Sequence, residues 1–90
     1  MEKREILKGL QIIPGIGKSI AEDLYNIGIR QVSDLKDGDP QKIFEQSNMY
    51  VGTVQDRCLL YVFRCSVYFA STKNPDPHLL KWWNWKDPPK

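Results

Sequence analysis

The sequence predicts a single all-α domain, a compact bundle of about five or six short helices. Signals for the start and the end of helices recur along the chain, whereas the strict apolar–polar alternation of a strand is nearly absent. The length of 90 residues is enough for one small domain with one core. We therefore expect residues 1–90 to form one unit.

The first two helices are predicted from the spacing of their apolar residues. Residues 4–10 place Leu7 and Leu10 on one helical face. A glycine-rich turn follows, and Gly28 lies where a helix-ending residue is expected. Between them, residues 18–26 carry four apolar side chains on a common side: Ile20, Ala21, Leu24 and Tyr25. The turn and this second helix together span residues 13–28.

Capping signals predict the two elements in the middle of the chain. Ser33 is expected to cap a short turn that ends near Lys36. The pair Asp39-Pro40 combines a capping carboxylate with proline at the first helical position. A helix is therefore expected to begin there and to continue to about Met49.

The longest helix and a tryptophan-rich helix complete the prediction. Thr53 is expected to cap the long helix, so this element occupies residues 53–70 and is central in the fold. Asp76-Pro77 repeats the start signal. We expect one last short helix in residues 76–87, which includes Leu79, Leu80, Trp82 and Trp83.

The charge balance is compatible with two kinds of protein surface. A net charge of +2 and a pI near 8.6 suit a polyanionic partner and equally suit an ordinary surface. The charged N-terminus does not resemble a signal peptide. The most apolar run, residues 59–70, is interrupted by Arg64 and is shorter than a membrane span. These features predict a cytoplasmic protein with no membrane partner.

The stretch I-P-G-I-G-K-S, residues 13–19, has the composition of an anion site. Glycine allows a sharp turn and the close approach of another group. A helix that begins directly after the turn presents unpaired N–H groups and the positive end of its dipole. Together with Lys18, these groups are suited to a phosphate. The spacing differs from G-x-x-x-x-G-K-[ST], and no strand precedes it, so a mononucleotide-binding P-loop is excluded.

The chain shows a short internal sequence similarity when Gly17 is aligned with Gly52. In both copies an apolar residue precedes the glycine and a leucine follows it by seven positions. The second turn, residues 50–53, has neither the first glycine nor the lysine. A chance match and a repeated helix–turn–helix unit with a degenerate second turn are both open.

Three motifs carry a family resemblance. I-I-P-G-I-G-K-S-I-A-E-D-L resembles the helix-hairpin-helix motif. With D-R-C-L-L-Y-V-F-R-C-S-V-Y-F-A and L-L-K-W-W-N-W-K-D, the chain resembles the small bacterial helix-hairpin-helix proteins of the pathogenicity-locus family over nearly its full length. The resemblance implies a SAM-like helical domain with one such motif and a degenerate second copy.

The resemblance also implies a role for the turn. In helix-hairpin-helix domains, the backbone amides of the hairpin contact a DNA phosphate without reading bases. Ile16 would fill the space between the two helices, and Ala21 would let them approach. A monovalent cation at turn carbonyls, such as those of Ile13 and Ile16, is also implied. The implied nucleic-acid contacts are Gly15, Gly17 and Lys18, with the side chains of Lys18 and Ser19 as further donors. The alternative is a tight connector between helices with no ligand.

A second candidate surface lies on the long helix. Arg57, Tyr61, Arg64 and Tyr68 fall on one narrow stripe at about 100° per residue. Such residues stack on bases and pair with phosphates, and they are equally typical of protein–protein hot spots. The alternative is that the tyrosines pack under neighbouring segments while the arginines pair with Asp or Glu. We call these four residues the α-stripe.

The remaining reactive and aromatic residues indicate no catalytic site. Cys58 and Cys65 lie seven positions apart in a helix, too far for a disulfide, and their spacing from His78 matches no zinc pattern. We therefore expect reduced cysteines, no metal and no enzyme activity. The C-terminal tryptophans are expected to pack against the long helix rather than to stack on bases.

The sequence therefore favours a non-enzymatic module that binds the nucleic-acid backbone, most naturally DNA, without sequence specificity. The alternative function is a small protein-interaction module that docks through the α-stripe.

Overall fold

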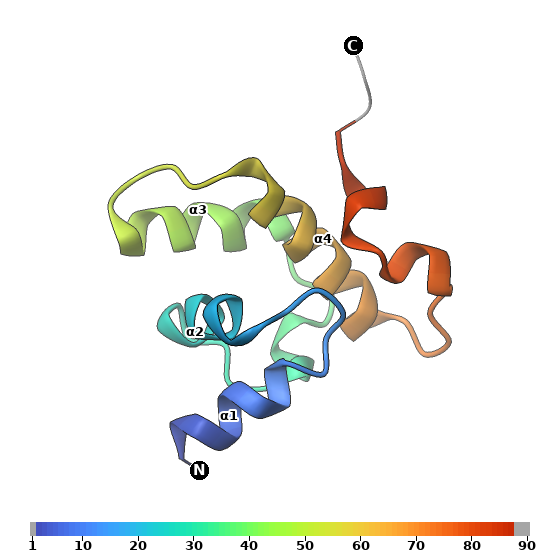
Figure 1. Cartoon of the computed structure of the whole chain (residues 1–90), viewed down its shortest axis with the longest axis horizontal. Helices are drawn as coiled ribbons and strands as arrows, with labels where there is room; N and C mark the ends of the chain where they lie inside the picture. Colours follow the sequence, from blue (N-terminus) through green and yellow to red (C-terminus); the bar gives the residue numbers. More distant parts are fainter. Residues whose placement is uncertain (1, 88–90) are drawn as a thin grey trace.

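Every regular element among residues 2–87, the part of the chain that the computed structural model describes, is helical. Four α-helices are joined and followed by three short 3-10 helices, in place of the predicted five or six helices (Figure 1). In chain order these are α1 (Lys3–Leu10), α2 (Lys18–Asn26), η1 (Val32–Leu35), α3 (Pro40–Val51), α4 (Arg57–Ser71), η2 (Pro77–Leu80) and η3 (Trp82–Trp85).

Local signals predicted helices α2 and α3 closely. Helix α2 begins and ends at the predicted residues, and its buried side chains Ala21 and Leu24 belong to the predicted face. Asp39 caps α3 as expected, since its Oδ1 accepts the N–H of Gln41 at 3.0 Å. Helix α3 ends at Val51, two positions beyond the predicted end, because Gly52 adopts φ 82° and closes it.

Two predicted caps were wrong. The 3-10 helix η1 is preceded by Gln31 rather than Ser33, and the Asp34 carboxylate accepts the Gln31 N–H at 3.2 Å. Thr53 does not cap α4. Instead, the Asp56 carboxylate accepts the N–H of Cys58 at 2.8 Å, and α4 therefore begins three positions later than predicted.

Hydrogen bonds to the end of α3 explain the late start of α4. Asn48 Oδ1 accepts the backbone N–H of Gln55 at 3.0 Å, and Ser47 Oγ lies 2.9 Å from Gln55 Nε2. These bonds hold the connection between α3 and α4 against the end of α3. The helical conformation of α4 therefore begins only after Asp56.

The predicted tryptophan-rich helix is divided into two 3-10 helices. Lys81 is extended and separates η2 from η3. The carbonyl of His78 accepts Asn84 Nδ2–H at 2.7 Å, and that of Leu79 accepts Trp85 Nε1–H at 2.7 Å. Side chains therefore bind carbonyls that a continuous helix would pair with backbone N–H groups.

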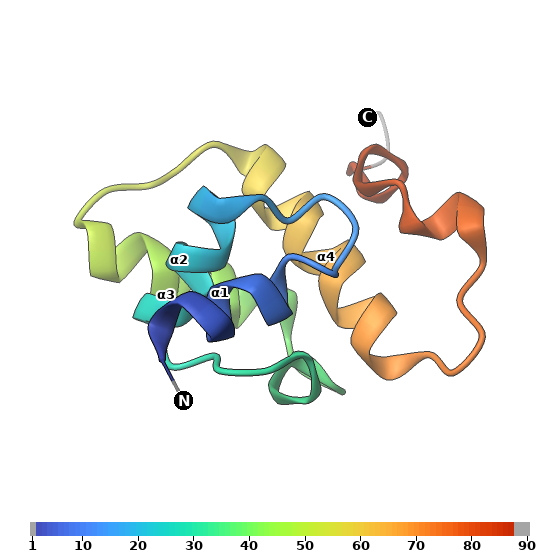
Figure 2. The ribbon, with the colours of Figure 1, turned by 60° about the horizontal axis from the view of Figure 1, so that its bottom comes forward.

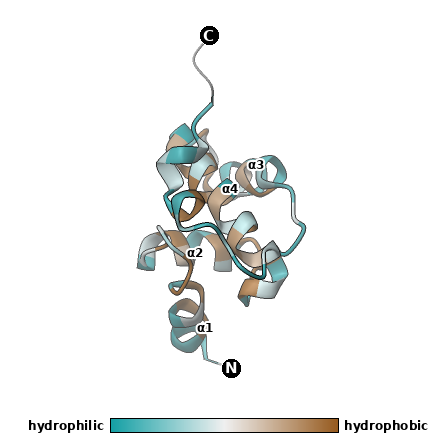
Figure 3. Ribbon diagram, turned by 90° about the vertical axis from the view of Figure 1, so that its right-hand side faces the viewer, coloured by the Kyte–Doolittle hydropathy of each residue, from teal (hydrophilic) through white to brown (hydrophobic). Residues whose placement is uncertain are grey.

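Helix α4 lies at the centre, as predicted. It packs against α3, η1, η2 and η3, and Leu60 and Phe63 are fully buried in the core (Figures 1 and 2). Figure 3 shows apolar stretches on α2 and α4 and hydrophilic residues at the start of α1, and the buried residues of α2 and α4 include Ala21, Leu24 and Leu60. The radius of gyration is 12.5 Å, which is close to the roughly 12 Å expected for a compact domain of this length.

The backbone does not support the predicted alignment of the two glycine turns. Gly17 has φ −92° and precedes α2, whereas Gly52 has φ 82° and follows α3. Gly15, with φ 86°, is the residue of the first turn that shares the left-handed conformation of Gly52. The internal sequence similarity therefore aligns two glycines whose backbone conformations differ.

Candidate functional site

The turn between α1 and α2 is built by two buried isoleucines. Ile13 and Ile16 belong to the hydrophobic core, and the Ile16 N–H donates to the Ile13 carbonyl at 3.1 Å. Gly15 lies between them with φ 86°, a conformation that favours glycine. The predicted nucleic-acid contacts Gly15, Gly17, Lys18 and Ser19 are all exposed on the outside of this turn.

Unpaired amides gather at the start of α2. Gly17 is the N-cap residue and offers no side chain for capping. Among the hydrogen bonds of residues 2–87, none is donated by the backbone N–H of Gly15, Gly17, Lys18 or Ser19. No acidic residue lies in the first turn of α2, and Lys18 adds a positive charge there. Because a cation at a helix N-terminus is unfavourable alone, this arrangement favours a bound anion.

The two glycines of the turn have different surroundings. A Cβ at Gly17 would meet nothing within 4 Å, and its φ of −92° suits any residue. A Cβ at Gly15 would lie 3.3 Å from Cδ1 of Trp82, which packs partly buried against the core. Gly17 is therefore open to an approaching ligand, whereas Gly15 is in contact with the C-terminal segment, residues 76–87.

One implied cation ligand is already engaged in the turn. The Ile13 carbonyl accepts the Ile16 N–H, which leaves one lone pair of that oxygen. No group of three or more His, Cys, Asp or Glu residues within 2–87 is arranged to hold a metal ion. Within the same residues, no helix is both long enough and apolar enough to cross a membrane.

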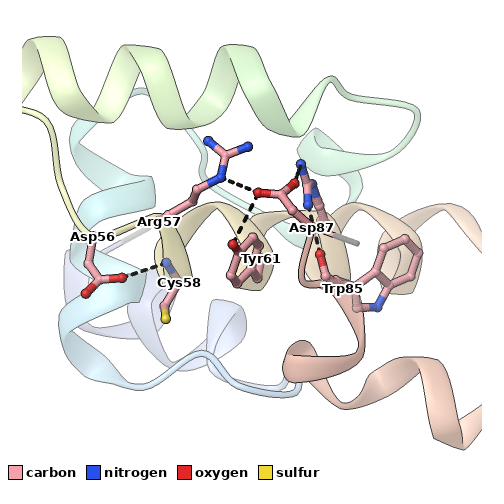
Figure 4. Close-up of polar contacts among 7 residues, drawn as sticks. Asp56, Arg57, Cys58, Tyr61, Trp85 and Asp87 are labelled. Atoms are coloured by element: carbon pink, nitrogen blue, oxygen red, sulfur yellow. Dashed lines mark hydrogen bonds and ion pairs between the residues drawn. The ribbon is translucent and has the colours of Figure 1, made fainter. Parts of the chain in front are cut away.

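The α-stripe contacts the C-terminal segment at all four of its residues. Arg57 Nε forms an ion pair with Asp87 Oδ2, which also accepts the Tyr61 hydroxyl at 3.2 Å (Figure 4). Arg64 Nη2 lies 3.0 Å from Asp87 Oδ1, and its Nη1 donates to the Trp85 carbonyl at 2.8 Å. The Tyr68 ring lies 5.5 Å from that of Trp85, and the Tyr68 hydroxyl accepts the Asp76 N–H at 2.8 Å.

These contacts match the structural alternative considered for the α-stripe, in which tyrosines pack under a neighbouring segment and arginines pair with a carboxylate. Hydrogen bonding from Arg57, with further contributions from Arg64 and Tyr61, holds the pKa of Asp87 well below its usual range. The Asp87 carboxylate is therefore ionised at neutral pH.

Asp87 and Trp85 are the site residues that sequence reasoning missed. A signal for Asp87 exists: only two carboxylates follow Arg57 in the sequence, Asp76 and Asp87. Asp76 is used to cap η2, since its Oδ1 accepts the His78 N–H at 2.9 Å. Arginines that face a neighbouring segment favour an acidic partner, and Asp87 is the carboxylate that remains after Arg57 in the sequence.

The tryptophans and cysteines have distinct environments. Trp82 and Trp85 pack as predicted, Trp82 against the core and Trp85 on Tyr68, but Trp83 is 49% exposed. Cys58 is exposed and Cys65 is buried, and both are free thiols. The hydrogen bond with Asp56 raises the pKa of Cys58, and burial raises the pKa of Cys65. Neither thiol is activated as a nucleophile.

A family model described as Cdd1, pathogenicity locus, matches residues 3–90. The chain belongs to this family. The mitomycin resistance protein McrB of Streptomyces lavendulae is 29% identical over 76 residues, which cover 84% of this chain and 69% of McrB. No solved structure matches the chain. The comparisons thus confirm the resemblance to the pathogenicity-locus family, and they do not bear on the helix-hairpin-helix motif or on an activity.

Proposed function

We propose that α1, the turn and α2 form a helix-hairpin-helix unit that binds the backbone of a nucleic acid, most naturally DNA. The observation that carries this proposal is a set of four exposed residues whose backbone amides donate no hydrogen bond, in the turn and at the start of α2: Gly15, Gly17, Lys18 and Ser19. Amides in this arrangement fit the oxygens of a phosphate.

The proposal includes binding without sequence specificity and without catalysis. Backbone amides and a lysine contact phosphate oxygens, which carry no direct sequence information. Gly17 is exposed and has open space where a side chain would begin, so no side chain of its own obstructs a phosphate near its N–H. Binding of this kind positions a strand and needs no reactive group.

The alternative, protein docking through the α-stripe, is less well supported. All four stripe residues are engaged with residues 76–87, so a protein partner would first have to displace this segment. The amides of the turn need no such rearrangement.

The test is a titration of fluorescein-labelled single-stranded, duplex and branched DNA at several salt concentrations. With two or three phosphate contacts, log affinity is expected to fall with log salt at a slope of about −2 to −3. Lys18→Ala should weaken binding to all sequences and make the slope shallower by about one unit. Gly17→Ala should weaken binding about tenfold or more, because its methyl group blocks the approach of the phosphate.

A matched control separates the turn from general charge. Lys42→Ala removes an exposed lysine on α3 and should leave the slope nearly unchanged. If Gly17→Ala and Lys18→Ala both bind DNA like the unmodified protein, the turn is only a connector and the proposal is wrong.

A further inference from the structure

Asp87 is held by three donors from one face of α4. Its Oδ2 accepts from Arg57 and Tyr61, and its Oδ1 lies 3.0 Å from Arg64 Nη2 (Figure 4). Two guanidinium groups and a hydroxyl thus surround both oxygens of one carboxylate. The same donors in the same arrangement suit a phosphate, since planar guanidinium groups bind both oxyanions through paired N–H groups.

The stretch from Trp82 to Asp87 connects the proposed phosphate site to the start of α4. Trp82 lies against Gly15 in the turn, and Asp87 reaches Arg57 at the start of α4. Five residue steps separate Trp82 from Asp87, and a fully extended chain would span at most about 18 Å over them. The turn and the arginine pair therefore contact opposite ends of one short stretch of the chain, and an extended polyanion can reach both.

The attachment of Asp87 is of a kind that a competing anion can replace. The side chains of Arg57, Arg64 and Asp87 are 53%, 26% and 37% exposed, so solvent reaches both ion pairs and weakens them. Trp82 and Trp85 keep their own contacts with the turn and with Tyr68. Asp87 can thus leave the arginines while the rest of the segment stays in place.

We infer that Arg57, Tyr61 and Arg64 form a second phosphate site, which the carboxylate of Asp87 fills in the unbound protein and withholds from the nucleic acid. This inference rests on the proposed function of the turn. Asp87 acts as an internal competitor, and its removal leaves Arg57 and Arg64 without their carboxylate partner, while Arg64 keeps its hydrogen bond to the Trp85 carbonyl.

The test compares Asp87→Ala and Asp87→Asn with the unmodified protein in the salt-dependent DNA titration. Two released arginines can each neutralise a phosphate, so the slope should become steeper by about 2 and binding at low salt should become tighter. Adding Arg57→Ala and Arg64→Ala to Asp87→Ala should restore the original slope. Asp87→Asn keeps the size of the side chain, which guards against loss of fold in the alanine variant.

Glu45→Ala is the matched control for net charge. It removes one exposed negative charge from α3 without touching the arginines. The inference is wrong if Asp87→Ala and Asp87→Asn give the same slope as Glu45→Ala. Weaker binding by the Asp87 variants would also overturn it, because the carboxylate would then support binding rather than compete.

The variant Asp87→Ala combined with Gly17→Ala distinguishes this inference from the proposed function. If the turn binds a phosphate, Gly17→Ala weakens binding in this background as well. If the Asp87 variants bind DNA with the steeper slope but Gly17→Ala has no effect in either background, the arginine site stands and the proposed role of the turn is wrong.

Discussion

Gly15 and Gly17 illustrate how neighbouring residues of one type meet different physical demands. Gly15 adopts φ 86° between two buried isoleucines and has the Trp82 ring beside it. Gly17 is extended, exposed and free of neighbours where a side chain would begin. The first glycine is required by the fold, whereas the second is required only by the proposed ligand.

Gly15→Ala is expected to destabilise the protein more than Gly17→Ala. The left-handed conformation costs an alanine about 1–2 kcal/mol, and its Cβ would also press on Trp82. Gly17→Ala should cost less than about 1 kcal/mol, through the weaker preference for alanine at an N-cap. Urea denaturation of both variants checks the order, and equal losses would contradict it.

Asp87 gives the protein a specific dependence on acid. Its folded-state pKa is lowered, so its stabilising effect is fully present above the unfolded pKa of about 3.9 and is lost as the pH falls further. The stability difference between the unmodified protein and Asp87→Asn should thus be constant near neutral pH and shrink below about pH 4.

Denaturation of the two proteins at a series of pH values measures this difference. Burial raises the pKa of Asp23, with a further effect of Glu22, which has the opposite consequence for acid stability. Asp23 is present in both proteins, so its contribution cancels. A difference that does not change with pH would show that Asp87 makes no pH-dependent contribution.

Helix α4 combines a buried face with a polar stripe. Leu60, Phe63 and Cys65 are fully buried, while Arg57 and Arg64 point to the C-terminal segment. Because α4 contacts both the core and this segment, the position of its first residue determines which side chains face each of them. The Asp56 cap and the hydrogen bonds of Gln55 define that start.

Asp56→Ala is expected to lower the midpoint of urea denaturation, whereas Thr53→Ala should leave it unchanged. The Asp56 carboxylate accepts a backbone N–H of the first turn of α4 and is favoured there by the helix dipole. Thr53 is exposed and lies outside the helix. The reverse order of the two midpoints would show that α4 begins at Thr53 in solution.

At the scale of the whole molecule, the C-terminal segment packs against the rest of the fold. Residues 76–87 lie beside α4 (Figure 2). Trp82 joins this segment to the core and to the α1–α2 turn. The segment has little regular structure of its own, so its position depends on aromatic and ionic contacts with α4. Its loss would therefore affect the core, the turn and the α-stripe together.

Trp82→Ala should destabilise the protein by roughly 2 kcal/mol, less than the 3–5 kcal/mol typical of a fully buried aromatic residue, because Trp82 is only partly buried. Trp83→Ala is the matched control and should cost clearly less, since Trp83 is 49% exposed. Thermal denaturation of both variants gives the comparison. Equal losses would mean that Trp82 does not hold the segment to the core.

The features that could be predicted from the sequence are those produced by neighbouring residues. Asp39-Pro40 starts α3 because the carboxylate accepts amides two and three positions away. The limits of α2 and its buried Ala21 and Leu24 follow from helical spacing. The exposed amides near Gly17 likewise arise from a turn that leads directly into a helix. The sequence also carries enough of the family's motifs to indicate its membership.

Other features depend on residues that are far apart in the chain. Asp56 rather than Thr53 caps α4, because the hydrogen bonds of Gln55 with Asn48 and Ser47 keep the residues before Asp56 out of the helix. Arg57 and Asp87 are 30 positions apart, so helical spacing can show that the arginines form a stripe but not what covers it. The division of the last helix depends on long side chains that reach back to carbonyls six positions earlier. Local patterns define where helices form, whereas the partners of charged and aromatic side chains follow from how the folded chain brings distant residues together.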